Sequence, residues 1–153
     1  MRVFILLFFC FSFVISAENF MKEMGPMLKE FRKIKTENNG NTKGKLKGLL
    51  AKLDKIAPKK DAQEYEIYLS AKGELLMANG DYEEAAKTLK KTKAASINYN
   101  WGIWKKIIES IFHSKGEKAA KAEYDKVVKK IGDKPLGRDF KELVGEHLDN
   151  LSK

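Results

Sequence analysis

The sequence predicts an all-α protein built from antiparallel helical hairpins. Apolar residues recur at intervals of three and four along most of the chain, which is the spacing of one face of an α-helix. No run of four or more residues alternates with a period of two, so no strand is expected. Short segments rich in Gly, Asn or Pro separate the periodic stretches. Such short connections make consecutive helices antiparallel neighbours.

Length and composition limit the class of protein. The 153 residues are 43% hydrophobic and 33% charged, with 11 Gly and 3 Pro. These values suit one small domain and exclude a disordered or a fibrous chain. A single Cys and two His exclude a disulfide scaffold and a Cys/His zinc module.

The first element is expected to be a signal peptide over residues 1–17, cleaved from the mature chain. Arg2 gives a positive start, residues 3–15 are almost unbroken in their apolar character, and Ser16 and Ala17 are small. Cleavage after Ser16 or after Ala17 fits equally well. The alternative is an uncleaved anchor helix, but a span needs about 20 apolar residues. We therefore expect residues 18–153 to form a single helical domain that is exported to the periplasm or the extracellular space.

Seven amphipathic helices are predicted in the mature chain. Their apolar stripes comprise Phe20, Met24, Met27, Phe31 and Ile34; Leu46, Leu49, Leu50, Leu53 and Ile56; Tyr65, Leu69 and Leu76; Tyr82, Ala85, Ala86 and Leu89; Trp104, Ile107, Ile108 and Ile111; Ala120, Tyr124, Val127 and Ile131; and Phe140, Leu143, Val144, His147 and Leu151. Gly25 and Pro26 are a weak point in the first helix. One alternative starts that helix at Pro26 and leaves residues 18–24 as a frayed arm.

Local signals predict where the helices begin and end. Residues 38–41 form a loop after the first helix, and Pro58 ends the second because the residue before a proline avoids helical geometry. Asp61 is expected to cap the third helix, Gly80 to end it in the left-handed conformation, and Asp81 to cap the fourth. The later helices are separated at residues 96–100, 115–116 and 132–135.

A self-comparison with an offset of about 35 residues shows an internal repeat. Residues 79–86 read Asn-Gly-Asp-Tyr-Glu-Glu-Ala-Ala. This stretch resembles the turn and second-helix start of the tetratricopeptide repeat, a helix–turn–helix unit of about 34 residues. In the first copy, Gly73 and Ala85 match the small residues of that family and Leu89 its large apolar residue. The second copy is matched by Trp104, Ile107, Ile111, Ala120, Tyr124 and Val127.

The resemblance covers residues 64–131 and implies a short solenoid of stacked hairpins. Residues 20–57 would add one more hairpin, and a terminal helix over 136–152 would cap the exposed apolar face. Two positions depart from the family, since Lys72 stands where an apolar residue is usual and Ile108 where a small one is usual. A plain helical bundle is the alternative, because alanine and aromatic residues at helical spacing occur in any bundle.

Charge is unevenly distributed along the mature chain. Residues 18–153 carry 29 basic and 21 acidic residues, a net charge of +8. Residues 38–60 hold seven Lys and one Asp, residues 61–84 one Lys and seven acids, and residues 85–134 thirteen Lys and five acids. Weak attraction to anionic envelope or extracellular polymers through these lysine-rich faces is the alternative function. Specific nucleic-acid recognition is not expected, because Arg32 and Arg138 are the only arginines of the mature chain.

The sequence contains no catalytic motif. It lacks a His-Glu-x-x-His motif, a Gly-x-Ser-x-Gly motif and a glycine-rich phosphate loop, and no Cys remains in the mature chain. Glu109 and Glu117 each lie four residues from His113, a spacing more typical of a surface contact than of a metal site. We therefore expect no enzyme activity, no metal and no cofactor.

The expected function is binding to a protein or peptide. In the tetratricopeptide family the first helices of successive units line a concave surface. Carried onto this sequence, that surface would include Ser70, Glu74 and Met77 from one unit and Lys105, Glu109, Phe112 and His113 from the next. Spacings of three and four place each set on one side of its helix. A groove of mixed charged and apolar character suits an extended or helical peptide, although the same residues could simply face solvent.

Overall fold

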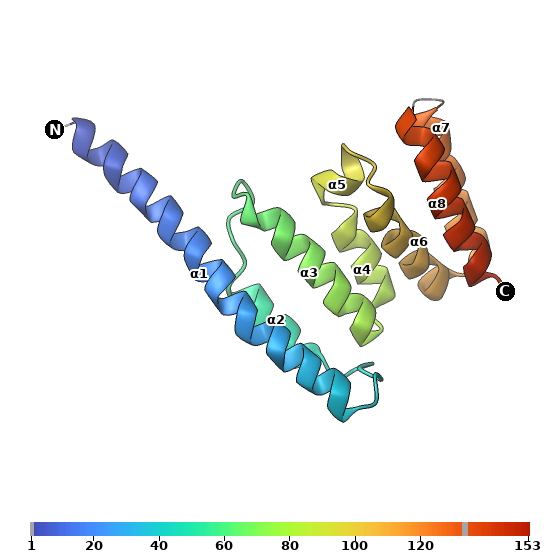
Figure 1. The fold of residues 1–153 in the computed structure, drawn as a ribbon, viewed down its shortest axis with the longest axis horizontal. Coiled ribbons are helices and arrows are strands. Elements are labelled where there is room, and N and C mark those ends of the chain that lie inside the picture. Colours follow the sequence, from blue (N-terminus) through green and yellow to red (C-terminus); the bar gives the residue numbers. More distant parts are fainter. Residues whose placement is uncertain (1, 133–134) are drawn as a thin grey trace. The chain divides into compact units, whose positions relative to one another are not determined.

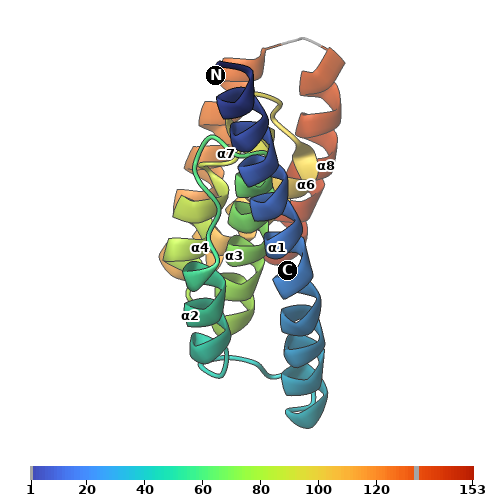
Figure 2. The same cartoon turned by 90° about the vertical axis from the view of Figure 1, so that its left-hand side faces the viewer.

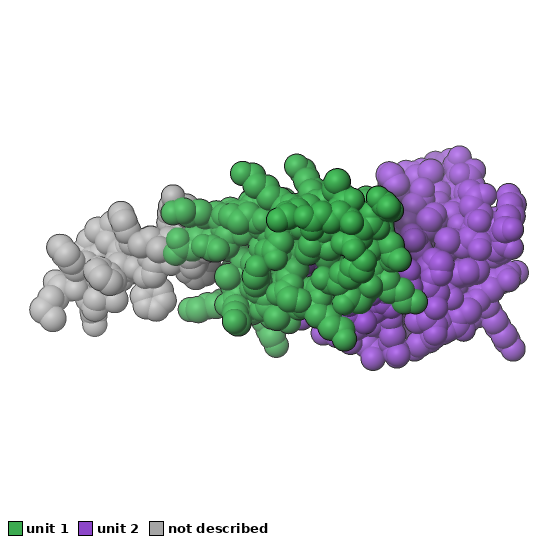
Figure 3. All heavy atoms as spheres, turned by 90° about the horizontal axis from the view of Figure 1, so that it is seen from below, with its two compact units in different colours: residues 1–68 green, residues 69–153 purple. Residues whose placement is uncertain are grey.

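The protein is helical throughout the part that its structure describes. The computed structural model describes residues 2–132 and 135–153, and the side chains of residues 19–132 and 137–153. Within these residues eight helices follow one another and no strand occurs, so the all-α prediction is confirmed. The chain forms two compact units, residues 1–68 and 69–153 (Figure 3).

The first unit contains α1 (Arg2–Glu37), α2 (Lys47–Lys55) and the first turn of α3 (Glu64–Asn79). The chain reverses over residues 38–46, so that α2 lies beside the C-terminal half of α1 (Figures 1 and 2). Lys52 of α2 donates hydrogen bonds of 2.7 and 2.9 Å to the carboxylate of Glu30 in α1. The predicted apolar stripes supply the buried positions, since the buried hydrophobic residues of α1, of α2 and of the residue before it are Phe20, Met27, Leu46, Leu49, Leu50 and Leu53. The other predicted members, Met24, Phe31, Ile34 and Ile56, are half-buried.

Helix α1 passes through its predicted weak point. The alternative start at Pro26 is wrong, because α1 is continuous from Arg2 to Glu37 with Pro26 inside it. A proline in this position removes a hydrogen bond to the carbonyl of Lys22. Both residues are exposed, so water can hydrate that carbonyl. The predicted signal peptide, residues 1–17, lies outside the residues whose side chains are described.

The second unit contains the rest of α3, then α4 (Tyr82–Leu89), α5 (Lys93–Ser96), α6 (Trp101–Lys115), α7 (Glu117–Ile131) and α8 (Pro135–Leu151). Helix α6 is central, with α4, α7 and α8 packed against it, and α7 also contacts α8 (Figure 1). The four-residue α5 is one helix more than the sequence predicted. Part of the last predicted joint, residues 133–134, lies outside the described residues.

The core of the second unit is formed by the apolar stripes of α4, α6, α7 and α8. Its buried members are Ala86, Leu89, Ala95, Trp104, Ile107, Ile108, Ile111, Ala120, Val127, Ile131, Phe140, Val144 and Leu148. The Trp104 indole N–H donates to the Ala95 carbonyl at 3.0 Å, and the Trp104 ring meets the edge of Phe140 with centroids 5.8 Å apart. Burial of one large apolar side chain contributes about 1.5–3 kcal/mol, so this cluster dominates the stability of the unit.

The turn between α3 and α4 follows the predicted geometry. Gly80 has a φ of 89°. The Gly80 N–H donates to the Met77 carbonyl at 3.0 Å and the Asp81 N–H to the Leu76 carbonyl at 2.9 Å, which closes α3 in a Schellman motif. Gly80 therefore ends the helix as expected, because a residue with a side chain is strained at this φ.

Both predicted aspartate caps need correction. Asp81 occupies the N-cap position of α4, but its side chain makes no capping hydrogen bond and instead accepts one of 2.6 Å from the amide of Asn79. Asp61 cannot cap α3, because that helix begins at Glu64. Around Asp61 the chain turns through hydrogen bonds from Ala62 N–H to the Lys59 carbonyl and from Tyr65 N–H to the Ala62 carbonyl.

Two glycines permit close approaches between helices of the second unit. A Cβ placed on Gly73 of α3 would lie 2.4 Å from Cδ2 of Leu89 in α4. A Cβ on Gly145 of α8 would lie 2.9 Å from the hydroxyl oxygen of Tyr124 in α7. Neither position has room for a side chain without movement of its neighbour.

Candidate functional site

The α3 part of the predicted binding surface is only partly exposed. Ser70 is half-buried and Glu74 is exposed. Met77, one turn further on, is half-buried and packs against the hydrophobic core of the second unit. Ser70 and Glu74 are therefore the members of this set that can meet a partner with little rearrangement.

The α6 part consists of residues with different surroundings. The Lys105 ammonium lies over the Trp101 ring, 5.0 Å from its centroid. Glu109 is half-buried, and its Oε2 lies 3.4 Å from Nε2 of His147 in α8. That contact has the separation of an ion pair for a protonated histidine, but its geometry is not that of a hydrogen bond. Glu109 is therefore turned toward α8.

Phe112 and His113 form the aromatic end of the predicted surface. Phe112 is half-buried against the core, and its ring meets His113 edge to face with centroids 5.7 Å apart. The exposed His113 also contacts Tyr82 at the start of α4, with ring centroids 4.8 Å apart. Three aromatic rings from two helices thus adjoin one another beside the α3–α4 turn.

The two predicted sets lie on helices that touch each other. Glu74 of α3 forms an ion pair with Lys106 of α6. Lys105, which the sequence placed on the binding surface, is the neighbour of the residue that makes this contact. The α3–α6 face, defined as Ser70, Glu74, Lys105, Lys106, Phe112 and His113, is therefore the candidate site.

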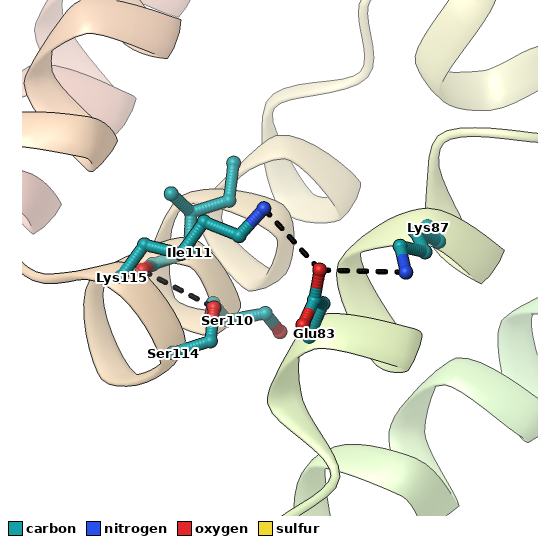
Figure 4. Close-up of polar contacts among 6 residues, drawn as sticks. All are labelled: Glu83, Lys87, Ser110, Ile111, Ser114 and Lys115. Atoms are coloured by element: carbon teal, nitrogen blue, oxygen red, sulfur yellow. Dashed lines mark hydrogen bonds and ion pairs between the residues drawn. The ribbon is translucent and has the colours of Figure 1, made fainter.

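A second group of polar residues lies between α4, α6 and α7. They border a hollow of about 230 Å³, whose lining residues are Glu83, Ala86, Lys87, Lys90, Ile111, Ser114, Lys115, Ala119 and Glu123. Figure 4 shows Glu83 between two lysines, with Lys115 Nζ at 3.3 Å and Lys87 Nζ at 3.4 Å. Lys90 pairs with Glu123 of α7 at 2.7 Å. The carboxylates and ammonium groups of this hollow are thus already matched with one another.

Electrostatics in this hollow favour the charged form of Glu83. Its pKa is lowered by hydrogen bonds from Lys115 and Lys87 and by the positive charges of the same two lysines. The Glu83 side chain is exposed, so solvent screens much of this attraction. The group has the character of a surface ion-pair cluster that joins α4 to α6.

Among the residues whose side chains are described, 19–132 and 137–153, no group of three or more His, Cys, Asp and Glu lies close enough to hold a metal ion.

Within the same two ranges, no helical segment is both long enough and apolar enough to cross a membrane.

Comparison with known proteins adds no relative to this picture. No family model matches the chain, and it has no match among curated proteins or solved structures.

Sequence reasoning missed three residues of the candidate site region. Lys106 pairs with Glu74, Tyr82 contacts the His113 ring at a tilt, and His147 contacts Glu109. The sequence pattern places both Tyr82 and His147 in the apolar stripes of their own helices. No spacing within one helix reveals these contacts, because each of them joins two different helices.

Proposed function

We propose that the chain is an exported, non-catalytic helical module of the tetratricopeptide type that binds a protein or peptide along the α3–α6 face. The observation that carries this proposal is the ion pair between Glu74 and Lys106, because it brings together the two helices that the repeat resemblance assigns to one binding surface. Exposed and half-buried side chains of both helices then present charged, polar and aromatic groups beside one another.

Local packing around α3 and α4 supports the repeat assignment. Gly73 lies directly against Leu89, and Ala85 is fully buried. Gly80 closes the helix with a positive φ. These are the positions at which the resemblance expects small residues and a turn glycine.

The chemistry of the face indicates the kind of peptide that it suits. On α6, His113 contacts the ring of the half-buried Phe112, and Lys105 and Lys106 lie about two turns before it. Glu74 is the carboxylate on the α3 side. A peptide with one apolar residue flanked by acidic side chains would contact Phe112 and the lysines together. Its affinity would be modest, because two helices make a shallow surface.

The binding proposal is tested with a display library of random peptides, selected on the full chain at physiological ionic strength. We expect the selected peptides to share an apolar residue and acidic neighbours. Glu74→Lys should alter the selected motif or abolish binding, because it reverses a charge in the face and breaks the pair with Lys106. Asp125→Lys makes the same charge change on α7, outside the α3–α6 face, and should leave binding intact. Selection of no motif, or equal loss in both variants, would refute the proposal.

Export is tested by N-terminal sequencing of the protein recovered from the cell envelope or medium. The proposal expects a mature chain that begins directly after Ser16 or after Ala17, because small residues precede a signal cleavage site. Recovery of a chain that still carries residues 1–17 from the cytosol would refute it.

A further inference from the structure

One end of the second unit exposes apolar side chains that the rest of the unit keeps inside. Ile97 is 65% exposed and Trp101 is 44% exposed, and these are the two exposed large apolar residues of this unit among those that the structure describes. Both belong to residues 97–101, which comprise the connection from α5 to α6 and the first residue of α6. We call this segment the aromatic loop. Figure 1 shows it at the end of α4 opposite the α3–α4 turn.

Hydrogen bonds fix the conformation of the aromatic loop. The Asn100 N–H donates to the Ala94 carbonyl at 2.7 Å, and the Asn100 side chain accepts from the Ile103 N–H at 3.1 Å. Tyr99 has a φ of 47°, a left-handed conformation that is strained for a residue with a side chain. Ile97 and Trp101 therefore project from a turn that is already ordered, so little conformational entropy is lost when they bind a surface.

Positive charge accompanies the exposed rings. The Lys105 ammonium lies 5.0 Å from the Trp101 ring centroid, and the Lys130 ammonium of α7 lies 5.7 Å from that of Tyr99. Residues 85–108 contain six Lys and no Asp or Glu. Three of these lysines, at positions 87, 90 and 106, pair with glutamates. The cations that lie beside the exposed rings at this end of the unit are Lys105 and Lys130.

We propose that the aromatic loop docks the protein onto the surface of an anionic lipid bilayer, a property beyond the proposed peptide binding. Trp101 would lie at the level of the headgroups, where tryptophan is enriched in membrane proteins, and Ile97 would enter the boundary with the acyl chains. Lys105 and Lys130 would face the lipid phosphates. The loop supplies a projecting apolar group and adjacent cations, which are the two contributions that peripheral membrane binding requires.

The same features favour lipid over nucleic acid. The most exposed apolar residue, Ile97, is aliphatic and cannot stack on a base as an aromatic ring does. The cations that contact the rings are lysines, which lack the planar fork with which arginine binds phosphates and bases.

The test uses the full chain and vesicles that contain lipids brominated near the headgroup. The protein contains two tryptophans, and Trp104 is 5% exposed whereas Trp101 is 44% exposed. Quenching by bromine therefore reports the depth of Trp101, even if another segment also contacts the vesicle. We expect strong quenching with vesicles of phosphatidylglycerol and phosphatidylethanolamine, little with phosphatidylcholine, and its loss in Trp101→Phe.

Matched variants separate the apolar and the charged contributions. Ile97→Ser should weaken the anionic-vesicle response about tenfold, because it removes the inserted aliphatic group. Lys130→Gln should weaken it about fivefold, whereas Lys118→Gln, at the opposite end of α7, should have no effect. Absence of quenching, equal quenching with neutral lipid, or a Trp101 response to a single-stranded oligonucleotide at lower concentration would overturn the proposal.

Discussion

The hairpins α3–α4 and α6–α7 have the same order of elements, but the closest contacts between their helices lie at different positions. In the first, Leu89 occupies the space that a side chain at Gly73 would need. The corresponding position of the second hairpin, 35 residues later, is Ile108, which is fully buried in the core. In this part of the chain, the close contact that a glycine permits lies between the next two helices, at Tyr124 of α7 and Gly145 of α8. Two hairpins with similar apolar spacing can therefore differ in where their helices approach most closely.

The second helices of the two hairpins also differ. Helix α4 has eight residues, whereas α7 has 15. The buried Thr92 hydroxyl donates to the Leu89 carbonyl and accepts from the Ala95 N–H, so one side chain closes α4 and caps α5. Thr92 therefore lies where this helical stretch divides into α4 and α5, and its hydroxyl bonds to both parts.

The largest expected effect comes from the position that replaces the glycine in the second hairpin. Ile108→Ala should lower the free energy of unfolding by about 2–5 kcal/mol, because it leaves a cavity among α6 and its neighbours. Urea unfolding measures this change. Ile97→Ala makes the same chemical change at an exposed position and should stay within about 0.5 kcal/mol of the parent. Similar losses in both variants would show that Ile108 does not hold the second hairpin together.

The next largest effect is expected at the close contact of the first hairpin. Gly73→Ala should cost about 1–3 kcal/mol in unfolding free energy, because the fully buried Leu89 cannot withdraw from the added methyl group. Gly48→Ala in α2 is the control, since its Cβ would meet open space. There the better helix propensity of alanine should stabilise the protein by up to about 1 kcal/mol. A stabilising Gly73→Ala would contradict the close approach.

A smaller effect is expected at the contact between α7 and α8. Gly145→Ala presses against the Tyr124 hydroxyl, which donates to the Lys141 carbonyl at 3.0 Å. Loss of that hydrogen bond costs about 1 kcal/mol, and the helix propensity of alanine offsets much of it. In a thermal double-mutant cycle, Tyr124→Phe should relieve the crowding, so the double variant should be more stable than the sum of the two single changes. Simple additivity would place the close contact elsewhere.

The smallest effect should come from the ion-pair cluster that joins the two hairpins. The lowered pKa of Glu83 means that the folded protein holds this proton less tightly than the unfolded chain does. Its contribution to stability is therefore present above the usual pKa of a glutamate and is lost as pH falls through the lowered value. Glu83→Gln should slightly flatten the acid side of a plot of Tm against pH, whereas Glu84→Gln should follow the parent. Identical curves for all three proteins would show that solvent cancels the pairing.

The sequence was sufficient to locate the helices of residues 18–153, apart from the four-residue α5, and many of their buried positions. Trp104, Ile107, Ile108 and Ile111 are all buried, as their spacing predicted. The period of a helix fixes which residues share a side, but it carries no information about which other helix that side meets. For this reason Glu109 was considered with His113 on its own helix, whereas the structure places it against His147 of α8.

The candidate site was predicted less completely for a related reason. Lys105 and Lys106 are adjacent and differ by about 100° around the helix axis, so the choice between them depends on how α6 is rotated against α3. The sequence favoured Lys105, and the ion pair uses Lys106. The predicted cap at Asp81 was wrong for a similar reason, since the side chain of Asp81 binds Asn79 rather than the first turn of α4.

The hydroxyl of Ser110, drawn in Figure 4, is fully buried on α6 and finds no hydrogen-bond partner among the described residues. A donor left without an acceptor gains a partner as soon as solvent enters, so local opening costs less here than at a fully apolar position. In deuterated buffer we therefore expect backbone amides near Ser110 to exchange sooner than their depth suggests, and Ser110→Ala to slow that exchange.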